Sequence, residues 1–208
     1  MINHKYKFIF IHIPKTAGET IYDILETPPK AYQWDFRYEK KILDKHETIT
    51  ESITLHQINN NYFKFAFVRN PWDRMVSLWA YCKKRNIKPV ADTDFKECIV
   101  NLEGLFCKVP QRYYSNSQRK INLLYPQYHF ISDWYGNNIL DFIGRFENLQ
   151  EDFNTVCDKI GVPRKRLPHK NKSKHKHYTE YYDDETKQIV AEKYAKDIKY
   201  FGYKFGED

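Results

Sequence analysis

Lys15 lies in a short segment whose residue types suit the binding of an anion such as a phosphate group. The segment Ile11-His12-Ile13-Pro14-Lys15-Thr16-Ala17-Gly18-Glu19-Thr20 is typical of a strand end, a tight turn and a helix start. Such a turn directs backbone N–H groups and the positive helix end toward one point. Ala17 and Gly18 allow close backbone approach, Lys15 adds a full charge, and Thr16 and Thr20 add hydroxyls.

The same segment would also suit an ordinary strand-to-helix turn. It does not match the Walker A loop of nucleotide triphosphatases, whose pattern GxxxxGK[ST] places the lysine after the glycines. Here Lys15 precedes Gly18. The pattern therefore argues against a nucleoside triphosphate and leaves the anion open.

Arg69 begins a second segment that could bind an anion. The run Val68-Arg69-Asn70-Pro71-Trp72-Asp73-Arg74-Met75-Val76-Ser77 follows an apolar stretch that reads as a buried strand. Asn is a good helix cap and Pro suits the first helical position, so a helix begins here. Arg69 then sits at the strand end, where open α/β sheets bind ligands, and Ser77 returns to the same helical face as Asn70. For Arg74 we expect a surface ion pair with Asp73 or another neighbour.

The positive charge of the chain is concentrated in one segment. The net charge is +7, and residues 159–179 contain eight Lys and Arg residues and no Asp or Glu. A field of this kind suits a polyanionic ligand, although a solvated basic loop would have the same composition.

The remaining composition limits the chemistry and the compartment. The four cysteines include no CxxC pair, so we expect reduced, mostly buried thiols and no zinc site. His169, His175 and His177 lie among lysines, which makes a metal site there unfavourable. No apolar run approaches the roughly 20 residues that cross a bilayer, and no secretory leader is visible. We expect a cytoplasmic protein and leave open peripheral membrane attachment and the oligomeric state.

The elements that position these segments alternate along the chain. Strands are predicted at residues 7–13, 63–68 and 140–146. Helices are predicted at residues 19–25, from 71 onward, at 94–105, at 149–160, and from 183 to about 201. This order predicts one α/β domain over residues 1–208, with a central parallel sheet covered by helices on both faces.

Together these segments resemble the sulfotransferases that use 3′-phosphoadenosine-5′-phosphosulfate (PAPS). Pro14-Lys15-Thr16-Ala17-Gly18 resembles their 5′-phosphosulfate loop. The run from Phe65 to Leu78, with its Arg and Ser eight residues apart, resembles their 3′-phosphate motif. Ile143-Gly144-Arg145-Phe146-Glu147-Asn148-Leu149, then Asp152-Phe153, and the ending Asp197-Ile198-Lys199-Tyr200-Phe201-Gly202-Tyr203 are similar to the carbohydrate branch, which includes the uronyl 2-O-sulfotransferases.

The resemblance implies a three-layer fold like that of P-loop NTPases and a sulfuryl transfer from PAPS to a carbohydrate hydroxyl, leaving PAP, without a metal. Lys15 would neutralise the leaving group and, with the amides of Thr16, Ala17, Gly18, Glu19 and Thr20, hold the 5′-phosphosulfate. Arg69 and Ser77 would hold the 3′-phosphate. Lys170, Lys172, Ser173 and Lys176 would close over the nucleotide.

One position departs from the family pattern, because Glu19 stands where we expect Thr or Ser. We expect its carboxylate to point away from the loop, with Thr20 as the loop hydroxyl. His56 lies shortly before the second strand, where the uronyl sulfotransferases carry their histidine base, so the resemblance implies that His56 takes the acceptor proton. His12 is the rival, more simply explained as a packed strand residue.

Other classes of function remain to be compared with this one. A nucleic-acid-binding module would explain the basic segment and leave both strand-end segments without a role. A P-loop kinase lacks the Walker lysine and a clear metal-binding acid. We therefore expect a glycan acceptor and no nucleic acid; aromatic residues such as Tyr113, Tyr114, Tyr125, Tyr128 and Trp134 could stack on sugars or pack in a core.

Overall fold

The computed structural model describes residues 1–26, 48–56, 61–109, 123–168 and 176–207, except the side chains of Glu51, Leu55 and His56. The chain divides into two compact units, each considered by itself below. Unit 1 contains Met1–Val68 and His129–Lys170, and unit 2 contains Arg69–Tyr128 and Asn171–Asp208.

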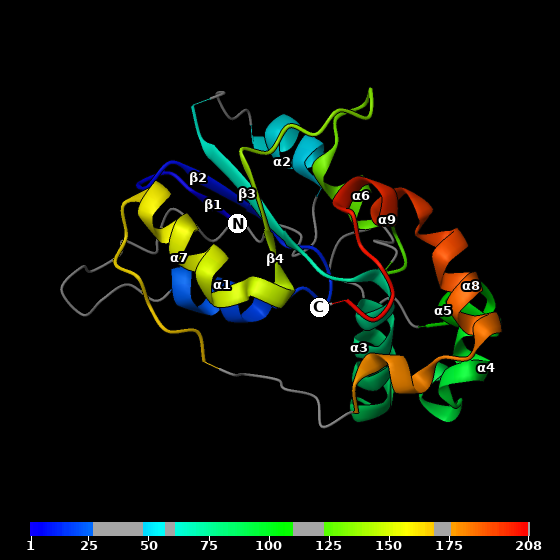
Figure 1. Ribbon diagram of the computed structural model, residues 1–208. Coiled ribbons are helices and arrows are strands. Elements are labelled where there is room, and N and C mark those ends of the chain that lie inside the picture. The colour runs from blue at the N-terminus through cyan, green and yellow to red at the C-terminus, as the bar shows by residue number, and fades with distance from the viewer. Residues whose placement is uncertain (27–47, 57–60, 110–122, 169–175, 208) are drawn as a thin grey trace. The chain divides into compact units, whose positions relative to one another are not determined.

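Unit 1 is built on a four-stranded sheet with the order β1-β2-β3-β4 (Figure 1). The strands are β1 (Ile2–Asn3), β2 (Phe8–Ile11), β3 (Phe63–Val68) and β4 (Phe142–Arg145). β2, β3 and β4 are parallel, with Phe10 paired to Phe65 and Phe65 paired to Phe142. The three predicted strands and their parallel arrangement are confirmed. The short antiparallel strand β1 was not predicted, because two residues carry no readable periodicity.

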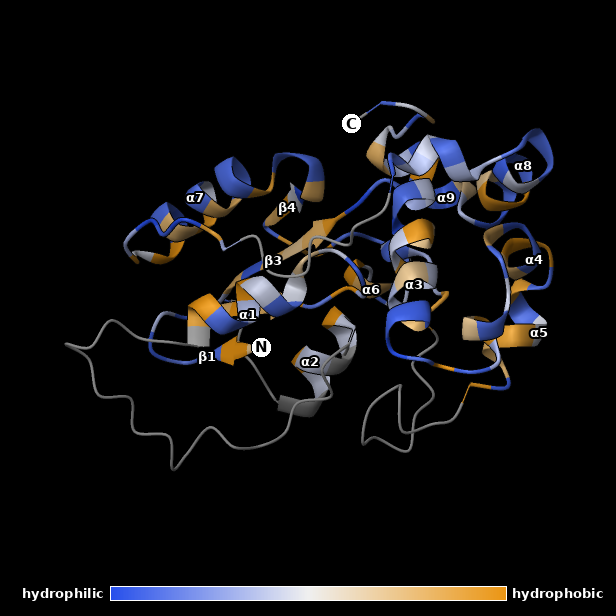
Figure 2. Ribbon diagram, turned by 90° about the horizontal axis from the view of Figure 1, so that it is seen from below, coloured by the Kyte–Doolittle hydropathy of each residue, from blue (hydrophilic) through white to orange (hydrophobic). Residues whose placement is uncertain are grey.

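Helices α1 (Gly18–Glu26) and α7 (Leu149–Ile160) pack on one face of this sheet (Figure 1). Their apolar residues form a core with the phenylalanines of β2 and β3: Phe8, Phe10, Ile21, Leu25, Phe65, Phe67, Phe153, Val156, Cys157 and Ile160. The opposite face of the strands is also buried, because Ile9, Ile11, Ala66 and Val68 have at most 1% of their surface exposed. Figure 2 shows the apolar character of β3 and the polar outer side of α7.

Two helices of the chain fall in stretches where the sequence predicted no element. α2 (Ile49–His56) precedes β3, and α6 (Gln127–Ile131) crosses from unit 2 into unit 1. The Thr50 hydroxyl donates to the Ser132 carbonyl oxygen at 3.0 Å, which ties α2 to the segment after α6.

Unit 2 is helical and is centred on α3 (Pro71–Lys84), which contacts the short 3₁₀ helices η1 (Val90–Asp92) and η4 (Tyr178–Tyr181) and the helices α4 (Phe95–Val100) and α8 (Asp184–Lys193). α5 (Leu102–Phe106) and α9 (Ala195–Phe201) complete it, while η3 (Phe146–Asn148) belongs to unit 1. The core of unit 2 includes Trp72, Met75, Val76, Leu78, Cys98, Ile99, Val190 and Tyr194.

Two predicted helices are each divided in the structure. The predicted helix at 94–105 becomes α4 and α5, and Asn101 between them turns its amide back to the Glu97 carbonyl oxygen at 3.2 Å. The last helix becomes α8 and α9 around Tyr194, whose hydroxyl donates to the Leu124 carbonyl oxygen at 3.1 Å in the core. The sequence therefore located both helical regions but not the break within each of them.

All four cysteines are free thiols, as expected, and three of them are buried: Cys82, Cys98 and Cys157. Burial raises the pKa of Cys98 to about 12, which keeps this thiol protonated and unreactive. Within the described ranges, no helix combines the length and the hydropathy that crossing a bilayer requires.

Candidate functional site

The predicted 5′ segment forms a tight turn between β2 and α1 in unit 1. β2 ends at Ile11 and α1 begins at Gly18. The Thr16 hydroxyl is fully buried and donates to the Ile13 carbonyl oxygen at 2.9 Å, so this hydroxyl closes the turn from within. The Thr20 and Ile21 amides donate to the Ala17 carbonyl oxygen at 3.0 and 3.2 Å and start the helix.

The backbone of this turn alternates in handedness. Lys15 has φ 70° and Ala17 has φ 66°, both in the left-handed region that side chains disfavour, whereas Thr16 between them is not left-handed. Alternation of this kind can turn successive N–H groups toward one side and form a concavity that suits an anion. Each left-handed residue other than glycine costs of order 1–3 kcal/mol, and residues strained in this way cluster at functional sites.

The His12 ring leaves no room for a side chain at position 18, which explains the glycine there. A Cβ atom on Gly18 would lie 1.9 Å from Cδ2 of His12. The His12 ring is 5% exposed and stacks on the Phe10 ring with a centroid separation of 6.0 Å. His12 is therefore a packed residue beneath the turn, as the simpler of its two interpretations predicted.

Of the next two residues, Glu19 is exposed and Thr20 is buried. The Glu19 side chain is exposed in the first turn of α1, where a carboxylate is favoured by the helix dipole, and Thr20 is 5% exposed. Exposure agrees with the expectation that Glu19 points away from the loop. His56, the predicted base, ends α2, and its side chain is outside the described residues.

The predicted 3′ segment follows β3, the strand that lies beside β2 in the sheet. The carboxyl ends of β2 and β3 share one sheet edge, since Ile11 pairs with Ala66. Arg69 follows Val68 directly and begins unit 2. α3 begins as predicted, with Pro71 in its first turn and the Asn70 side chain accepting from the Trp72 amide at 3.2 Å.

Arg69 is buried, with 7% of its surface exposed, and its side chain makes an ion pair with Asp73. Its Nε donates to Oδ2 of Asp73 at 2.7 Å, one turn further on. Ser77 lies on α3 and is 8% exposed. A buried ion pair of this kind fixes the direction of the guanidinium group.

The backbone of Arg69 is held by Gln127, which the sequence did not single out and which is held in turn by Asp197. Gln127 is fully buried; its Oε1 accepts from the Arg69 amide at 2.9 Å and its Nε2 donates to the Arg69 carbonyl at 2.7 Å. The carboxylate of Asp197 accepts from the Gln127 amide at 2.7 Å and from the Tyr128 amide at 2.9 Å. Burial raises the pKa of Asp197 above the ordinary value of an aspartate.

The prediction of a surface ion pair for Arg74 is wrong. Arg74 is 1% exposed, and its Nη2 donates to the carbonyl oxygens of Leu123 at 2.9 Å and Tyr125 at 3.0 Å. Its guanidinium carbon also lies 5.6 Å from the centre of the Tyr194 ring. The error arose because a side chain that faces inward on α3 finds partners about 50 residues away in the chain, which helical spacing does not reveal.

Asn70 also binds the end of the chain. Its Nδ2 donates to the carbonyl oxygens of Lys204 at 3.0 Å and Glu207 at 3.1 Å, while its own oxygen caps α3. Phe205 packs edge-on against Trp72 at 5.5 Å. The Asn70 side chain thus joins the start of α3 to the carboxyl-terminal segment.

The basic segment is only partly within the described residues. Lys170, Lys172 and Ser173 lie outside them. Lys176 is exposed and 3.4 Å from Glu180, and Arg164 pairs with Asp158 at 2.7 Å. Both acids flank the segment counted as wholly basic, so part of its charge is balanced by its immediate neighbours.

The motif that follows β4 has a structural explanation. The Asp152 carboxylate accepts from the Arg145 amide at 2.6 Å and from Nδ2 of Asn148 at 3.0 Å. A Cβ on Gly144 would lie 2.5 Å from Cε1 of Phe67. These residues fasten the turn into α7, and none of them needs a ligand.

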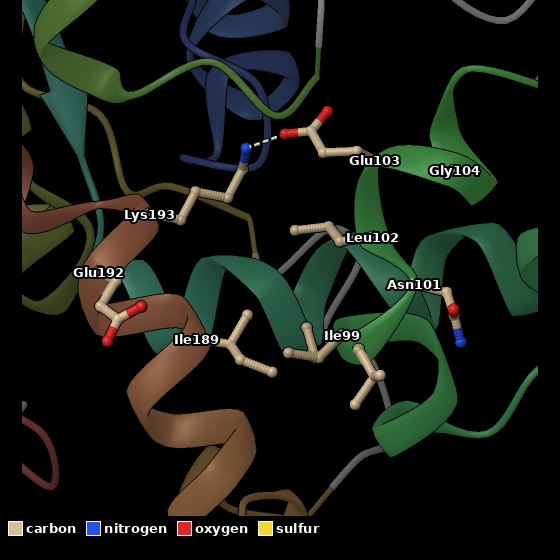
Figure 3. A pocket seen from close by; sticks show the side chains of 9 residues that line it. Ile99, Asn101, Leu102, Glu103, Gly104, Ile189, Glu192 and Lys193 are labelled. Carbon is tan, nitrogen blue, oxygen red and sulfur yellow. Dashed lines mark hydrogen bonds and ion pairs between the residues drawn. The ribbon is translucent and has the colours of Figure 1, made fainter.

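Unit 2 also contains a pocket formed by residues of α4, α5 and α8. Ile99, Leu102 and Ile189 line it, with the Glu103–Lys193 ion pair at its side (Figure 3). None of the predicted site residues belongs to it. Across the described ranges, no group of three His, Cys, Asp or Glu side chains is placed to hold a metal ion.

The comparison with protein families decides the relationship. The family model described as "Sulfotransferase family" matches residues 1–204. The chain belongs to the sulfotransferase family. This confirms the resemblance found in the sequence, and it covers both the turn after β2 and the segment after β3.

Individual relatives of this sulfotransferase are distant. It is 26% identical to human carbohydrate sulfotransferase 9 over 217 residues, covering 95% of this chain and 47% of that protein. It is 34% identical over 106 residues to an uncharacterized protein of Archaeoglobus fulgidus, covering 50% of this chain and 72% of that one. The chain thus spans about half the length of the human relative.

The fold agrees with the family. The structure of mouse sulfotransferase SULT7A1 complexed with PAP matches 95% of this chain and 85% of that chain, with a TM-score of 0.50 and 13% identity. At this identity the match speaks for the fold alone. The predicted α/β architecture is therefore confirmed.

Proposed function

We propose that this sulfotransferase transfers a sulfuryl group from PAPS to a hydroxyl of a carbohydrate acceptor, working as one domain over residues 1–208. The observation that carries the proposal is the turn at residues 12–18, where left-handed Lys15 and Ala17 flank Thr16 at the start of α1. A strained, positively charged turn of this kind is suited to a tetrahedral anion.

The donor fits the residues that are present. Lys15 and the amides of Thr16, Ala17, Gly18, Glu19 and Thr20 would hold the 5′-phosphosulfate. The Thr16 hydroxyl already donates to Ile13, so Thr16 contributes through its amide. Arg69 and Ser77 would hold the 3′-phosphate, with the Arg69 backbone kept in place by Gln127. Lys170, Lys172, Ser173 and Lys176 are proposed to contact the nucleotide from the basic segment.

The reaction that these residues would support is an in-line displacement. The acceptor oxygen forms a bond to sulfur while the bond between sulfur and the bridging phosphate oxygen breaks, and the acceptor proton passes to a base. PAP leaves with an added negative charge, which Lys15 would neutralise. His56 remains the proposed base, since the packing of His12 against Gly18 and Phe10 suits a structural residue.

The acceptor class rests on the relative. The human relative is named as a carbohydrate sulfotransferase, and the segments around Arg145 and Asp197 predicted the carbohydrate branch. The cytoplasmic location stays a prediction.

Titration calorimetry tests the donor site. PAP, ATP and a single-stranded oligonucleotide are each titrated into the protein in the presence of EDTA. We expect tight binding of PAP, weaker binding of ATP, and binding of the oligonucleotide only at low salt. A preference for ATP or for the oligonucleotide would contradict the proposal, and transfer from labelled PAPS to unsulfated glycans then tests the acceptor.

A further inference from the structure

A small hairpin after α6 exposes two large aromatic side chains. Trp134 is 82% exposed and Tyr135 is 91% exposed. Other aromatic residues of the described ranges, such as Phe10, Phe67 and Tyr194, are almost completely buried. Since aromatic rings contribute most to cores and interfaces, two adjacent rings in solvent need an explanation.

The exposure of these rings belongs to an ordered turn. Ser132 and Asn138 form an antiparallel bridge, and the Asp133 amide donates to the Asn137 carbonyl oxygen at 2.9 Å. Oδ1 of Asp133 accepts from the amides of Asn137 at 2.7 Å and Tyr135 at 2.9 Å, and Oδ2 accepts from Nδ2 of Asn137 at 3.2 Å. These N–H groups, that of Asn137 foremost, lower the pKa of Asp133 and keep it ionised. The turn is therefore built to hold the two rings outward.

The hairpin is anchored to α2 within unit 1. The Thr50 hydroxyl binds the Ser132 carbonyl oxygen at the base of the hairpin, at 3.0 Å, and Figure 1 shows the hairpin projecting beside α2. α2 is also the helix that ends at His56, the proposed base. A ligand on the hairpin would thus be held by an element attached to the helix that carries this residue.

We propose that Trp134 and Tyr135 form an aromatic platform that binds a sugar ring of the carbohydrate acceptor, an inference that rests on the proposed function. The flat faces suit the apolar C–H face of a pyranose. The indole N–H and the phenol hydroxyl can bond to sugar hydroxyls at the edge of the ring. A free sugar chain needs no deep pocket, which agrees with rings presented on a projecting turn.

The platform is tested with the full chain and two double variants. Trp134→Ala with Tyr135→Ala removes both rings, and Trp134→Phe with Tyr135→Phe keeps the stacking faces. Val100→Ala, a change at an apolar residue 47% exposed on α4, is the matched control. Transfer from PAPS is measured with unsulfated chondroitin and heparosan hexasaccharides, and PAP affinity is measured by calorimetry.

We expect the alanine pair to raise the KM for the acceptor roughly tenfold, as for a lost aromatic contact worth more than about 1 kcal/mol, with kcat and PAP affinity unchanged. The phenylalanine pair should raise the KM less than the alanine pair, because it keeps the stacking faces and loses only the polar groups at the ring edges. The control should stay close to wild type. Titration of the hexasaccharide should change the tryptophan fluorescence of the wild type and not that of Trp134→Phe.

The outcomes separate the two proposals. An unchanged acceptor KM in the alanine pair would overturn the platform and leave the proposed function standing. Binding to vesicles of phosphatidylcholine and phosphatidylserine that is lost in the alanine pair, with unchanged acceptor KM, would assign the rings to a membrane surface instead. Tight PAP binding with neither binding nor sulfation of any saccharide would refute the acceptor class and, with it, the platform.

Discussion

Replacing Gly18 with alanine should destabilise unit 1 through a single steric contact. The new Cβ would lie 1.9 Å from Cδ2 and 2.1 Å from Nε2 of His12. Carbon atoms pack best at about 3.5–4.0 Å, so the ring or the helix start must move by more than 1 Å. Because the ring is 5% exposed and stacked on Phe10, it has little room to do so.

The expected loss of stability follows from the size of this displacement. Overpacking a well-packed core costs typically 1–3 kcal/mol, and the helix propensity that alanine gains over glycine offsets at most about 1 kcal/mol. We expect Gly18→Ala to lower the free energy of unfolding by about 1–2 kcal/mol. With a urea m-value of about 2 kcal/mol/M, the midpoint of unfolding falls by roughly 0.5–1 M.

The assay is urea unfolding followed by circular dichroism, with two comparisons. Gly104→Ala in α5 is the control, because nothing lies within 4 Å of its Cβ, and it should be neutral or slightly stabilising. His12→Ala removes the ring, so Gly18→Ala should cost less in that background. Equal costs of Gly18→Ala with and without the His12 ring would refute the steric explanation.

Four further predictions concern the site. Ala17→Gly should raise stability by about 0.5–1 kcal/mol in thermal unfolding, because glycine adopts the left-handed conformation without strain; a loss would contradict the alternating turn. Arg69→Ala should weaken PAP binding in calorimetry by roughly 1.5–3 kcal/mol, whereas Lys15→Ala should mainly lower kcat, because the charge it meets grows in the transition state; normal PAP affinity in Arg69→Ala would exclude the 3′-phosphate role. His56→Ala should lower turnover by about 10²–10⁴-fold with PAP affinity retained, and the rise of kcat/KM with pH should disappear; near-normal turnover would transfer the role elsewhere. Burial raises the pKa of Asp197 in the folded state, so the stability that this group contributes falls as pH rises from the ordinary pKa of aspartate through the raised one. Asp197→Asn should remove that fall when the free energy of unfolding is measured against pH. The same dependence on pH in both proteins would show that Asp197 does not titrate this way.

The sequence by itself determined the elements that depend on near neighbours. The apolar run before Arg69 predicted β3, and its bounds are those observed. Asn70 and Pro71 predicted the start of α3, because capping and the fixed φ of proline act within a few residues. The turn after β2 was likewise located from Lys15 and Gly18, since its residue types and order are local.

The left-handed conformation within that turn was beyond the sequence. Lys15 and Ala17 are residues that favour other conformations, so nothing in their types predicted φ values of 70° and 66°. The turn adopts them because the ends of β2 and α1 are fixed by their packing in the core of unit 1.

Only the tertiary structure decided which polar side chains support the site. Gln127 holds the Arg69 backbone from 58 residues away, Asp197 holds the Gln127 amide from 70 residues away, and Arg74 finds its carbonyl partners 49 and 51 residues away. A buried polar group must find a hydrogen-bond partner wherever the fold brings one. Spacing along the chain therefore identifies the charges that could meet a ligand, whereas the fold decides which of them are instead used to hold the backbone in place.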